Sequence, residues 1–420
     1  MTDPMVLTLY ERPPCGYGCA GCPSCRPQVP LAPDIAAALA STTLVSVNPT
    51  TEPGVFALAA TRKIGSVTVD FLTVRVEPKT PISNVLWMMG YTRNPRWWSR
   101  QTTLVGTAAD FVEALAEAFV IAAEQAIAQG LLSGYREVEE PSTVLRGRLR
   151  TGEQITRRFG LALPVEVRYD EYDEDIPENQ LLLAATLILL SNVDLPVRLR
   201  TRMARIRQSL ADVTAPTRGA EPAWISTRLN LRYHWALHLA ELIIEHNSVE
   251  HRIGNVTIRG FVVDMWKVFE DFLMTTLSDA IGRRGGRGLR PRTNTTTRYL
   301  DQARTVVIEP DLLWSDVSNR PITVIDAKYK ILTAGKSSPN ADLYQLTAYC
   351  TALGLREGHL IYATGETHPR PVEIIGADIT IRCHALDLTL PPSDLLLSVE
   401  KFVADTERRF KGLDTCALPV

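Results

Sequence analysis

The hydrophobic positions along the chain follow two different periods. Between residues 40 and 78, β-branched residues bounded by Pro and Gly form short segments such as GSVTVDFLTVRVEP, which predict strands. From residue 110 to Gly130 the apolar residues instead recur at helical spacing, and the glycine predicts the end of that helix. The helical pattern returns from 179 to 213, with an interruption at 194–196, and again from 228 to 246. The first 250 residues therefore combine a strand-rich portion with a helical portion.

The pattern changes again after Gly260. The segment FVVDMWKVFEDFLMTTLSDAIG predicts a helix, and the Gly/Arg-rich loop GRRGGRGLRPR follows it. Two apolar strands come next, TVVIEPDLLW and TVIDAKYK, and the polar stretch SDVSNRP between them predicts a hairpin. A helix, further strands and a final helix from 392 to about 409 complete the chain. Helices flanking a small sheet indicate a compact α/β unit.

Composition narrows the class of protein only a little. The chain has 420 residues, 45% hydrophobic and 22% charged, as in ordinary globular proteins. A net charge of −2 neither favours nor excludes nucleic acid as a partner, because a local basic site can exist within a neutral total. The most apolar run, Leu181 to Leu190, is too short to cross a membrane, and the N-terminus does not have the pattern of a signal peptide. We therefore expect a cytoplasmic protein without a membrane contact.

Four of the seven cysteines lie within eleven residues near the N-terminus. They have the spacing C-x3-C-x2-C-x2-C and are Cys15, Cys19, Cys22 and Cys25. In a reducing compartment such a cluster indicates a metal site rather than a disulfide framework. Four thiolates suit structural Zn²⁺ and, as a less favoured choice, an iron–sulfur cluster; the absence of any metal stays open as a third possibility.

The strand TVIDAKYK carries the most informative polar residues. Side chains alternate along a strand, so Asp326 and Lys328 point to the same face. Such a pair is either a structural ion pair or part of a catalytic site. The predicted hairpin brings Asp311 beside it. Two carboxylates can bind Mg²⁺, which lowers the pKa of a bound water, and a lysine can position the nucleophile. The pattern therefore suits phosphodiester hydrolysis.

Two helices add further polar residues. Glu270 lies at the margin of the apolar face of its predicted helix, where the ordinary interpretation is a solvated glutamate. In DLYQLTAYC, Gln345 and Tyr349 are four residues apart and share a helix face. Together they can hold a catalytic lysine, a metal ligand or a DNA phosphate, although Tyr349 alone would more often be core packing.

In this order, helix Glu, strand Asp, strand Asp-x-Lys and helix Gln-x-x-x-Tyr resemble the PD-(D/E)xK nuclease superfamily and its RecB-like branch. The resemblance implies an α/β fold, α+β overall. A mixed β/α N-terminal domain and a helical middle region precede a C-terminal restriction-endonuclease-like domain along the chain. The predicted segments are 1–30, cysteine-rich; 31–177, partner docking; 178–255, helical connection; and 256–420, nuclease.

A closer resemblance covers most of residues 80 to 420. Several stretches resemble the McrC family. In the C-terminal part they are FVVDMWKVFEDFL, EPDLLW, VIDAKYK and DLYQLTAYC, and upstream they include ISNVLWMMGY and LNLRYHWALHLAELII. These proteins are nuclease subunits of McrBC-type modification-dependent restriction systems, which act in antiviral defence. The N-terminal cysteines depart from the family pattern.

The resemblance implies roles for six residues. Asp311 and Asp326 become Mg²⁺ ligands, Lys328 the catalytic lysine and Glu270 the helix carboxylate, while Gln345 and Tyr349 become supporting residues. It also implies an endonuclease subunit that cuts modified double-stranded DNA and docks onto, and stimulates, a ring-forming AAA+ GTPase of the McrB type. The chain has no P-loop pattern, which is consistent with a separate motor.

Basic residues in the Gly/Arg-rich loop supply candidate phosphate contacts. They are Arg283, Arg284, Arg287, Arg290 and Arg292. Such a loop could follow a DNA backbone without reading its sequence, and a solvated loop is the alternative. Two other functions stay open for the whole chain: a mainly non-catalytic activator of the GTPase, and a stand-alone RecB-like exonuclease. An Asp326→Ala exchange discriminates the nuclease from the activator.

Overall fold

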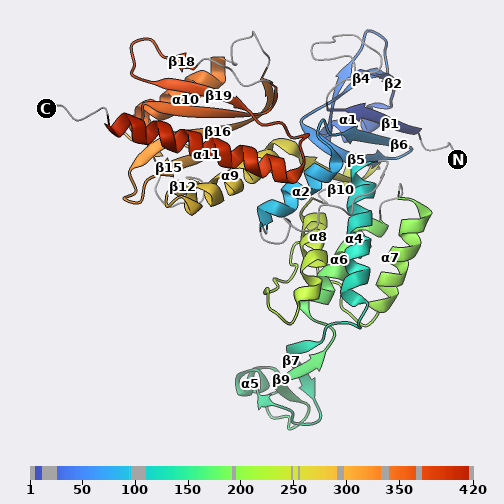
Figure 1. Cartoon of the computed structure of the whole chain (residues 1–420). Coiled ribbons are helices and arrows are strands. Elements are labelled where there is room, and N and C mark those ends of the chain that lie inside the picture. Colours follow the sequence, from blue (N-terminus) through green and yellow to red (C-terminus); the bar gives the residue numbers. More distant parts are fainter. Residues whose placement is uncertain are drawn as a thin grey trace. The chain divides into compact units, whose positions relative to one another are not determined.

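The computed structural model describes residues 5–11, 26–93, 95, 110–191, 195–246, 249–253, 256–290, 298–332, 340–365 and 371–415 (Figure 1). Within those ranges, no helix has the length and apolar character needed to span a membrane. The chain forms two compact units. The first comprises Met1–Leu104, Arg252–Ile258 and Val262–Val420, and the second Val105–His251 and Arg259–Phe261. The four clustered cysteines lie outside the described residues, so the metal site there stays a prediction, as do the four predicted segments.

The N-terminal strands confirm the pattern seen between residues 40 and 78. A five-stranded sheet has the order β1-β6-β5-β11-β10, with β1 and β6 parallel and β5 and β6 antiparallel. Its strands are β1 (Met5–Tyr10), β5 (Lys63–Val69), β6 (Leu72–Glu77), β10 (Val249–Ile253) and β11 (Val256–Asp264). A three-stranded sheet accompanies it, made of β2 (Gln28–Pro30), β4 (Val55–Ala60) and β3 (Val45–Pro49), with helices α1 (Pro33–Ser41) and α2 (Ile82–Arg93).

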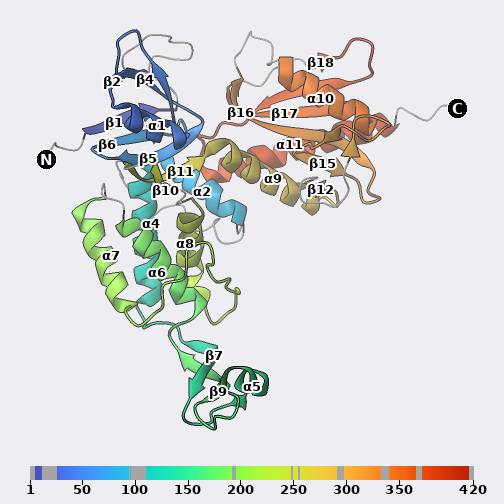
Figure 2. The same ribbon diagram turned by 180° about the vertical axis from the view of Figure 1, so that it is seen from behind.

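The C-terminal part contains a six-stranded mixed sheet of order β12-β15-β16-β17-β19-β18. Its strands are β12 (Arg287–Leu289), β15 (Leu312–Ser315), β16 (Pro321–Leu332), β17 (Glu357–Gly365), β18 (Val372–Glu373) and β19 (Thr380–Ala385). A short pair, β13 (Arg298–Tyr299) and β14 (Val307–Ile308), lies outside this sheet. Helices α10 (Asn340–Leu353) and α11 (Pro392–Thr415) cover its opposite faces (Figures 1 and 2).

The predicted hairpin is confirmed. Strands β15 and β16 are antiparallel, with Leu312 opposite Ile325 and Leu313 opposite Val324. On its other side β16 pairs with β17 in parallel, and the register shifts by one residue between Lys328 and Ile331. A bulge of this kind redirects side chains locally and is common beside functional sites. It lies directly after the Asp-x-Lys pair.

The predicted helix after Gly260 needs a correction at its start. Phe261, Val262 and Val263 belong to strand β11, and helix α9 runs from Met265 to Arg283. These β-branched and aromatic residues favour a strand, and pairing with a distant strand decided the outcome over the helical spacing. Part of the predicted Gly/Arg-rich loop is likewise regular structure, because Gly282 and Arg283 belong to α9 and Arg287–Leu289 form β12.

The second unit confirms the predicted helical runs. It contains α4 (Phe111–Ile127), α6 (Pro177–Leu190), α7 (Val197–Ser209), a 3₁₀ turn η1 (Leu231–Tyr233) and α8 (His234–His246). Asp110 caps α4 by accepting a hydrogen bond from the backbone N–H of Glu113 at 2.8 Å. A three-stranded sheet of order β7-β9-β8 also belongs to this unit, with β7 (Gly134–Ser142), β8 (Arg148–Leu149), β9 (Val165–Asp173) and the helix α5 (Thr151–Arg158).

A glycine lets α10 approach the C-terminal sheet. A Cβ atom added to Gly358 of β17 would lie 2.8 Å from Cys350 Sγ and 3.1 Å from Leu346, both on α10. Gly358→Ala is therefore expected to lower the free energy of unfolding by about 1–3 kcal/mol, measured by urea denaturation. Gly282→Ala in α9 is the matched control, because its Cβ would meet nothing within 4 Å. Equal stability of the two variants would contradict this packing argument.

Candidate active site

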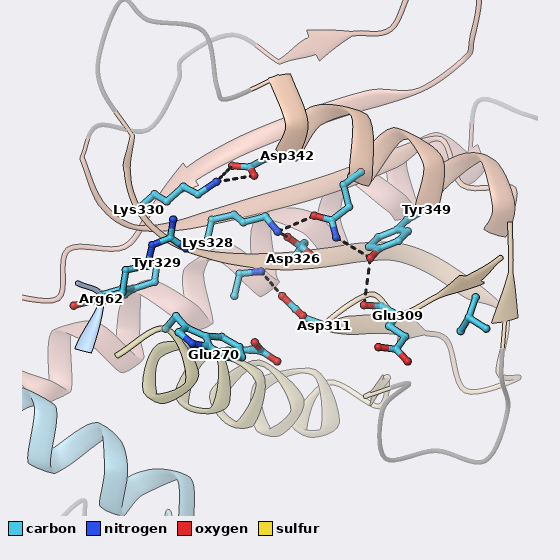
Figure 3. A pocket seen from close by; sticks show the side chains of 14 residues that line it. Arg62, Glu270, Glu309, Asp311, Asp326, Lys328, Tyr329, Lys330, Asp342 and Tyr349 are labelled. Carbon is cyan, nitrogen blue, oxygen red and sulfur yellow. Dashed lines mark hydrogen bonds and ion pairs between the residues drawn. The ribbon is translucent and has the colours of Figure 1, made fainter. Parts of the chain in front are cut away.

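A cavity of about 560 Å³ opens at the β15–β16 hairpin, between α9 and α10 (Figure 3). All six residues that the sequence predicts to be catalytic line it. The full lining is Arg62, Trp266, Glu270, Val307, Glu309, Asp311, Asp326, Ala327, Lys328, Tyr329, Lys330, Asp342, Gln345 and Tyr349. The structure thus brings together residues that are up to 79 positions apart in the predicted set, from Glu270 to Tyr349.

The two aspartates are fixed by the hairpin. Asp311 precedes β15, and its Oδ2 accepts a hydrogen bond of 2.8 Å from the backbone N–H of Ala327 on β16. This bond holds Asp311 against the residue that follows Asp326. Asp326 is only 3% exposed, and its carboxylate forms an ion pair with Lys328. The local hairpin therefore places both carboxylates and the lysine at one position, as the sequence predicts.

Burial and charge both act on the Asp326 carboxyl group. Burial raises its pKa to about 6, and the negative charge of Asp311 adds to this effect, while Lys328 opposes it. Burial by itself lowers the pKa of Lys328. The neighbouring carboxylates, of which Asp326 has the largest effect, outweigh burial and raise the lysine pKa above its usual value. Lys328 is therefore a permanent cation beside two crowded acids.

Helix α10 holds the lysine from the other side. Lys328 Nζ donates to Gln345 Oε1 at 2.9 Å, and Gln345 Nε2 is 2.9 Å from the hydroxyl oxygen of Tyr349. That hydroxyl group donates to the backbone carbonyl of Glu309 at 3.4 Å. Burial raises the pKa of Tyr349, so its hydroxyl group stays protonated. Gln345 thus links Lys328 to Tyr349, and the supporting role of this pair in catalysis stays a prediction.

Glu270 contributes a further carboxylate from α9. Its side chain is half-buried and borders the same cavity as Asp311 (Figure 3). The ordinary interpretation of a solvated helix-edge glutamate therefore misses its surroundings, because the helix margin here is the wall of a cavity. Its chemical role stays a prediction.

Sequence reasoning missed part of the cavity wall. Lys330, which the alternation of β16 places on the face of Lys328, forms an ion pair with Asp342 of α10 at 2.9 Å. Asp342 is 5% exposed and also accepts a hydrogen bond of 3.3 Å from the Tyr362 hydroxyl group. Asp342 stands three residues before Gln345, so helical spacing could have indicated it. Arg62, far upstream, carried no such signal.

Four of the five arginines predicted to bind DNA lie outside the cavity lining. Arg283 and Arg284 form ion pairs with Glu400 and Glu407 of α11, the second at 3.1 Å. Arg287 donates to Asn319 at 3.0 Å, and Arg290 is 3.4 Å from Asp271. None of these four lines the cavity, and Arg292 lies outside the described residues. Their role as phosphate contacts stays a prediction.

The donor chemistry of the cavity fits a hard divalent cation. Within the described part of the chain, no group of three or more His, Cys, Asp or Glu residues forms a complete metal-coordination site. Mg²⁺ does not need one, since it is typically held by one or two carboxylates and several waters. Five carboxylates and three cationic side chains line the cavity. A divalent cation at Asp311 and Asp326 would offset this negative excess, including the repulsion from Asp311 that adds to the effect of burial on the pKa of Asp326.

Comparisons with known proteins agree with the resemblance. A family model described as "McrBC 5-methylcytosine restriction system component" matches residues 58–363. Among solved structures, a chain of the half-complex of Thermococcus gammatolerans McrB AAA+ hexamers with bound McrC is 16% identical with a TM-score of 0.58, and the match covers 96% of this chain and 100% of that one. At this identity the likeness shows the fold alone.

A second match, to the cryo-EM structure of the Thermococcus gammatolerans McrBC complex, is 20% identical and covers 66% of this chain and 88% of that one, at a TM-score of 0.39. A search of curated protein sequences finds no match. The family model spans well over half of the chain, including both strands of the hairpin and all of the predicted catalytic residues. The chain therefore belongs to the family of McrBC 5-methylcytosine restriction system components.

Proposed function

We propose that this protein is the endonuclease subunit of a modification-dependent restriction system and hydrolyses phosphodiester bonds in modified double-stranded DNA with Mg²⁺. The observation that carries the proposal is the convergence of Asp311, Asp326 and Lys328 in one cavity, with Lys328 fixed by Gln345. A mixed sheet that presents these residues on a hairpin between two helices fits a PD-(D/E)xK nuclease domain.

Each residue has a distinct task in this proposal. Asp311 and Asp326 would hold the Mg²⁺ ion, which supplies positive charge at the phosphate and lowers the pKa of a bound water. The Lys328 ammonium group stabilises the negative charge that develops on the phosphate and orients the attacking water. Gln345 restricts the lysine to the geometry in which it can do so. Glu270 offers a further acceptor from α9.

The partner follows from the family and from the similar structure. That structure consists, by its own description, of McrB AAA+ hexamers with bound McrC. We therefore propose a McrB-type AAA+ GTPase ring as the partner, which activates cleavage and whose GTP hydrolysis this chain stimulates. Recognition of the modified base would belong to that motor, so this chain would cut without reading the modification.

The test combines the full chain with the AAA+ GTPase from the same system, GTP and a duplex with or without 5-methylcytosine. We expect cleavage only when the methylated duplex, the motor and Mg²⁺ are all present, and none in EDTA. Stimulation of GTP hydrolysis without any cleavage would instead establish the non-catalytic activator. Degradation of DNA ends by the chain alone would establish the stand-alone exonuclease.

Gln345→Ala tests how the lysine is positioned. The exchange removes the 2.9 Å hydrogen bond to Lys328 Nζ but leaves its ion pair with Asp326. We expect kcat to fall by about tenfold with little change in KM, because a misplaced lysine affects mainly the transition state. Tyr349→Phe is the matched variant: it removes the hydroxyl group that contacts Gln345 and the Glu309 carbonyl but leaves the hydrogen bond from Lys328 to Gln345, so the loss should be smaller. A larger loss for Tyr349→Phe would contradict this order of action.

A further inference from the structure

An arginine from the N-terminal strands reaches the cavity of the C-terminal sheet. Arg62 lies in the link between β4 and β5, and it is exposed and lines the cavity that also holds Asp326 and Lys328. Figure 3 shows Arg62 and Lys330 at one end of this cavity, and Glu309 and Tyr349 at the other. The N-terminal half therefore provides part of the wall of the proposed active site.

The three cations of the cavity differ in what they already bind. Lys328 is paired with Asp326, and Lys330 is paired with Asp342. As far as the described residues show, the guanidinium group of Arg62 has no carboxylate partner. Its charge is therefore not already compensated within the described cavity. A phosphate group that enters the cavity can therefore pair with the positive charge of Arg62.

The backbone around Arg62 is held firmly. Its carbonyl oxygen accepts a hydrogen bond of 3.2 Å from the N–H of Met265, the first residue of α9. On one side the Thr61 hydroxyl group donates to the carbonyl of Leu44 at 2.9 Å, and on the other Lys63 is 3.4 Å from Asp264. A positively charged side chain on an anchored link can act at a defined place.

A second contact holds the N-terminal strands against the catalytic strand. Glu11, at the end of β1, accepts a hydrogen bond of 2.8 Å from the hydroxyl group of Tyr329, the residue after Lys328. Lys79, beyond the end of β6, places its Nζ 3.5 Å from the centre of the Tyr329 ring. These contacts fix the position of the N-terminal sheet relative to the bulge in β16, and thereby the position of Arg62 relative to the cavity.

We infer that Arg62 is a DNA-binding residue that contacts a phosphate next to the bond to be cut. Guanidinium groups suit phosphate oxygens because they donate two parallel hydrogen bonds. A contact of this kind adds affinity without reading sequence. The inference rests on the proposed nuclease function, because the phosphate is that of the DNA substrate.

Binding is tested first, without chemistry. The full chain is titrated against a fluorescein-labelled duplex in EDTA over a series of KCl concentrations, and affinity is followed by fluorescence anisotropy. We expect Arg62→Ala to weaken binding about tenfold at low salt and to reduce the slope of log affinity against log salt by about one. Methylated and unmethylated duplexes should lose the same factor. Arg62→Lys should retain most of the affinity, since it keeps the charge.

The control is Arg356→Ala. Arg356 is exposed, pairs with Asp378 on the surface and does not line the cavity, so its exchange should leave binding unchanged. In cleavage with the motor and Mg²⁺, Arg62→Ala should raise KM about tenfold and leave kcat within about twofold. Circular dichroism and thermal unfolding show that the variants are folded.

Two results separate this inference from the proposed function. If Arg62→Ala binds and cuts like the wild-type chain, or loses no more affinity than Arg356→Ala, the assignment of Arg62 is wrong and the nuclease proposal stands. If the wild-type chain neither binds nor cuts DNA under any of these conditions, the proposed function is wrong and the inference falls with it.

Discussion

An Asp326→Ala variant is expected to lose DNA cleavage by roughly a thousandfold or more while it still stimulates GTP hydrolysis by the motor. The large effect follows from two tasks that meet in one side chain. Asp326 is a proposed Mg²⁺ ligand, and its carboxylate also pairs with Lys328. Removing it weakens the charge that stabilises the reacting phosphate and releases the lysine at the same time. Cleavage is measured on a methylated duplex with the motor, GTP and Mg²⁺.

The variant Asp326→Asn separates charge from shape. Its amide retains the size of the carboxylate and an oxygen that can accept a hydrogen bond from Lys328, but it carries no charge for a cation. We expect it to be nearly as inactive as the alanine variant. Asp378→Ala, on an exposed acid that pairs with Arg356 at the surface and does not line the cavity, should cleave normally. Undiminished cleavage by Asp326→Asn would show that the metal-binding assignment is wrong.

GTPase stimulation decides between loss of chemistry and loss of fold. Asp326 is buried at a position where a wrong residue can destabilise the sheet, so absence of cleavage alone is ambiguous. A variant that stimulates the motor like the wild-type chain, yet does not cut, has kept its fold and its docking. Loss of both activities would point instead to unfolding or to failed docking.

The parts of the site that the sequence predicted are those that local structure builds. Asp311, Asp326 and Lys328 lie on one hairpin, and the alternation of side chains along a strand is enough to bring them together. Gln345 and Tyr349 share one helix face by spacing alone. The same rules would have identified Lys330, had its partner Asp342 been considered with it.

The parts that the sequence did not predict depend on distant pairing. Arg62 reaches the cavity only because β5 joins β11 in one sheet and its link bonds to the start of α9. The same pairing turned the residues Phe261 to Val263 into a strand, against the helical pattern that continues after them. Neither periodicity nor composition encodes which strand lies next to which.

The histidines show the same limit. In the sequence they are scattered without metal-ligand spacing, and no role follows. In the structure β17 and β19 are parallel neighbours, with Ile361 opposite His384, and His359 Nδ1 lies 3.1 Å from His384 Nε2. Glu357 approaches the other ring nitrogen of His359 at 3.2 Å. Phe402 packs edge-on against both rings. The register of two strands has created a cluster of polar side chains around the buried ring of His359.

This cluster predicts a loss of stability in mild acid. Burial lowers the pKa of His384 to about 3, and positive charge on His359, Arg409 and Arg382 acts in the same direction. Between pH 6.5 and about 3, this histidine is protonated in the unfolded chain and neutral in the folded chain. The stabilisation from neutral His384 is therefore complete above pH 6.5 and is lost progressively as the pH falls toward 3. Between pH 6.5 and 4.5 the loss is about 2–3 kcal/mol.

The window from pH 6.5 to 4.5 lies above the pH range in which the neighbouring acid Glu357 affects stability. The pKa of Glu357 is lowered to about 2, against the effect of its burial, by the His359 ring nitrogen 3.2 Å away and by the nearby cations Arg409 and Arg382. Its stabilising contribution is present above pH 4.5 and is lost only below it. Asp326 acts in the opposite direction, because its raised pKa of about 6 makes the folded chain gain stability as the pH falls from 6 to 3.8. A raw pH profile would mix these effects.

Comparison with His384→Gln isolates the histidine. Glutamine can keep a hydrogen bond to His359 but takes up no proton in this range. Urea unfolding at pH 7.5 first gives the packing cost of the exchange, since both side chains are neutral there. We expect the variant to lose about 2–3 kcal/mol less than the wild-type chain when the pH is lowered to 4.5, so that the two stabilities converge or cross. If the two curves of unfolding free energy against pH were parallel, His384 would take up a proton in the folded chain as readily as in the unfolded one. The strand register would then bring the two rings together without keeping them neutral.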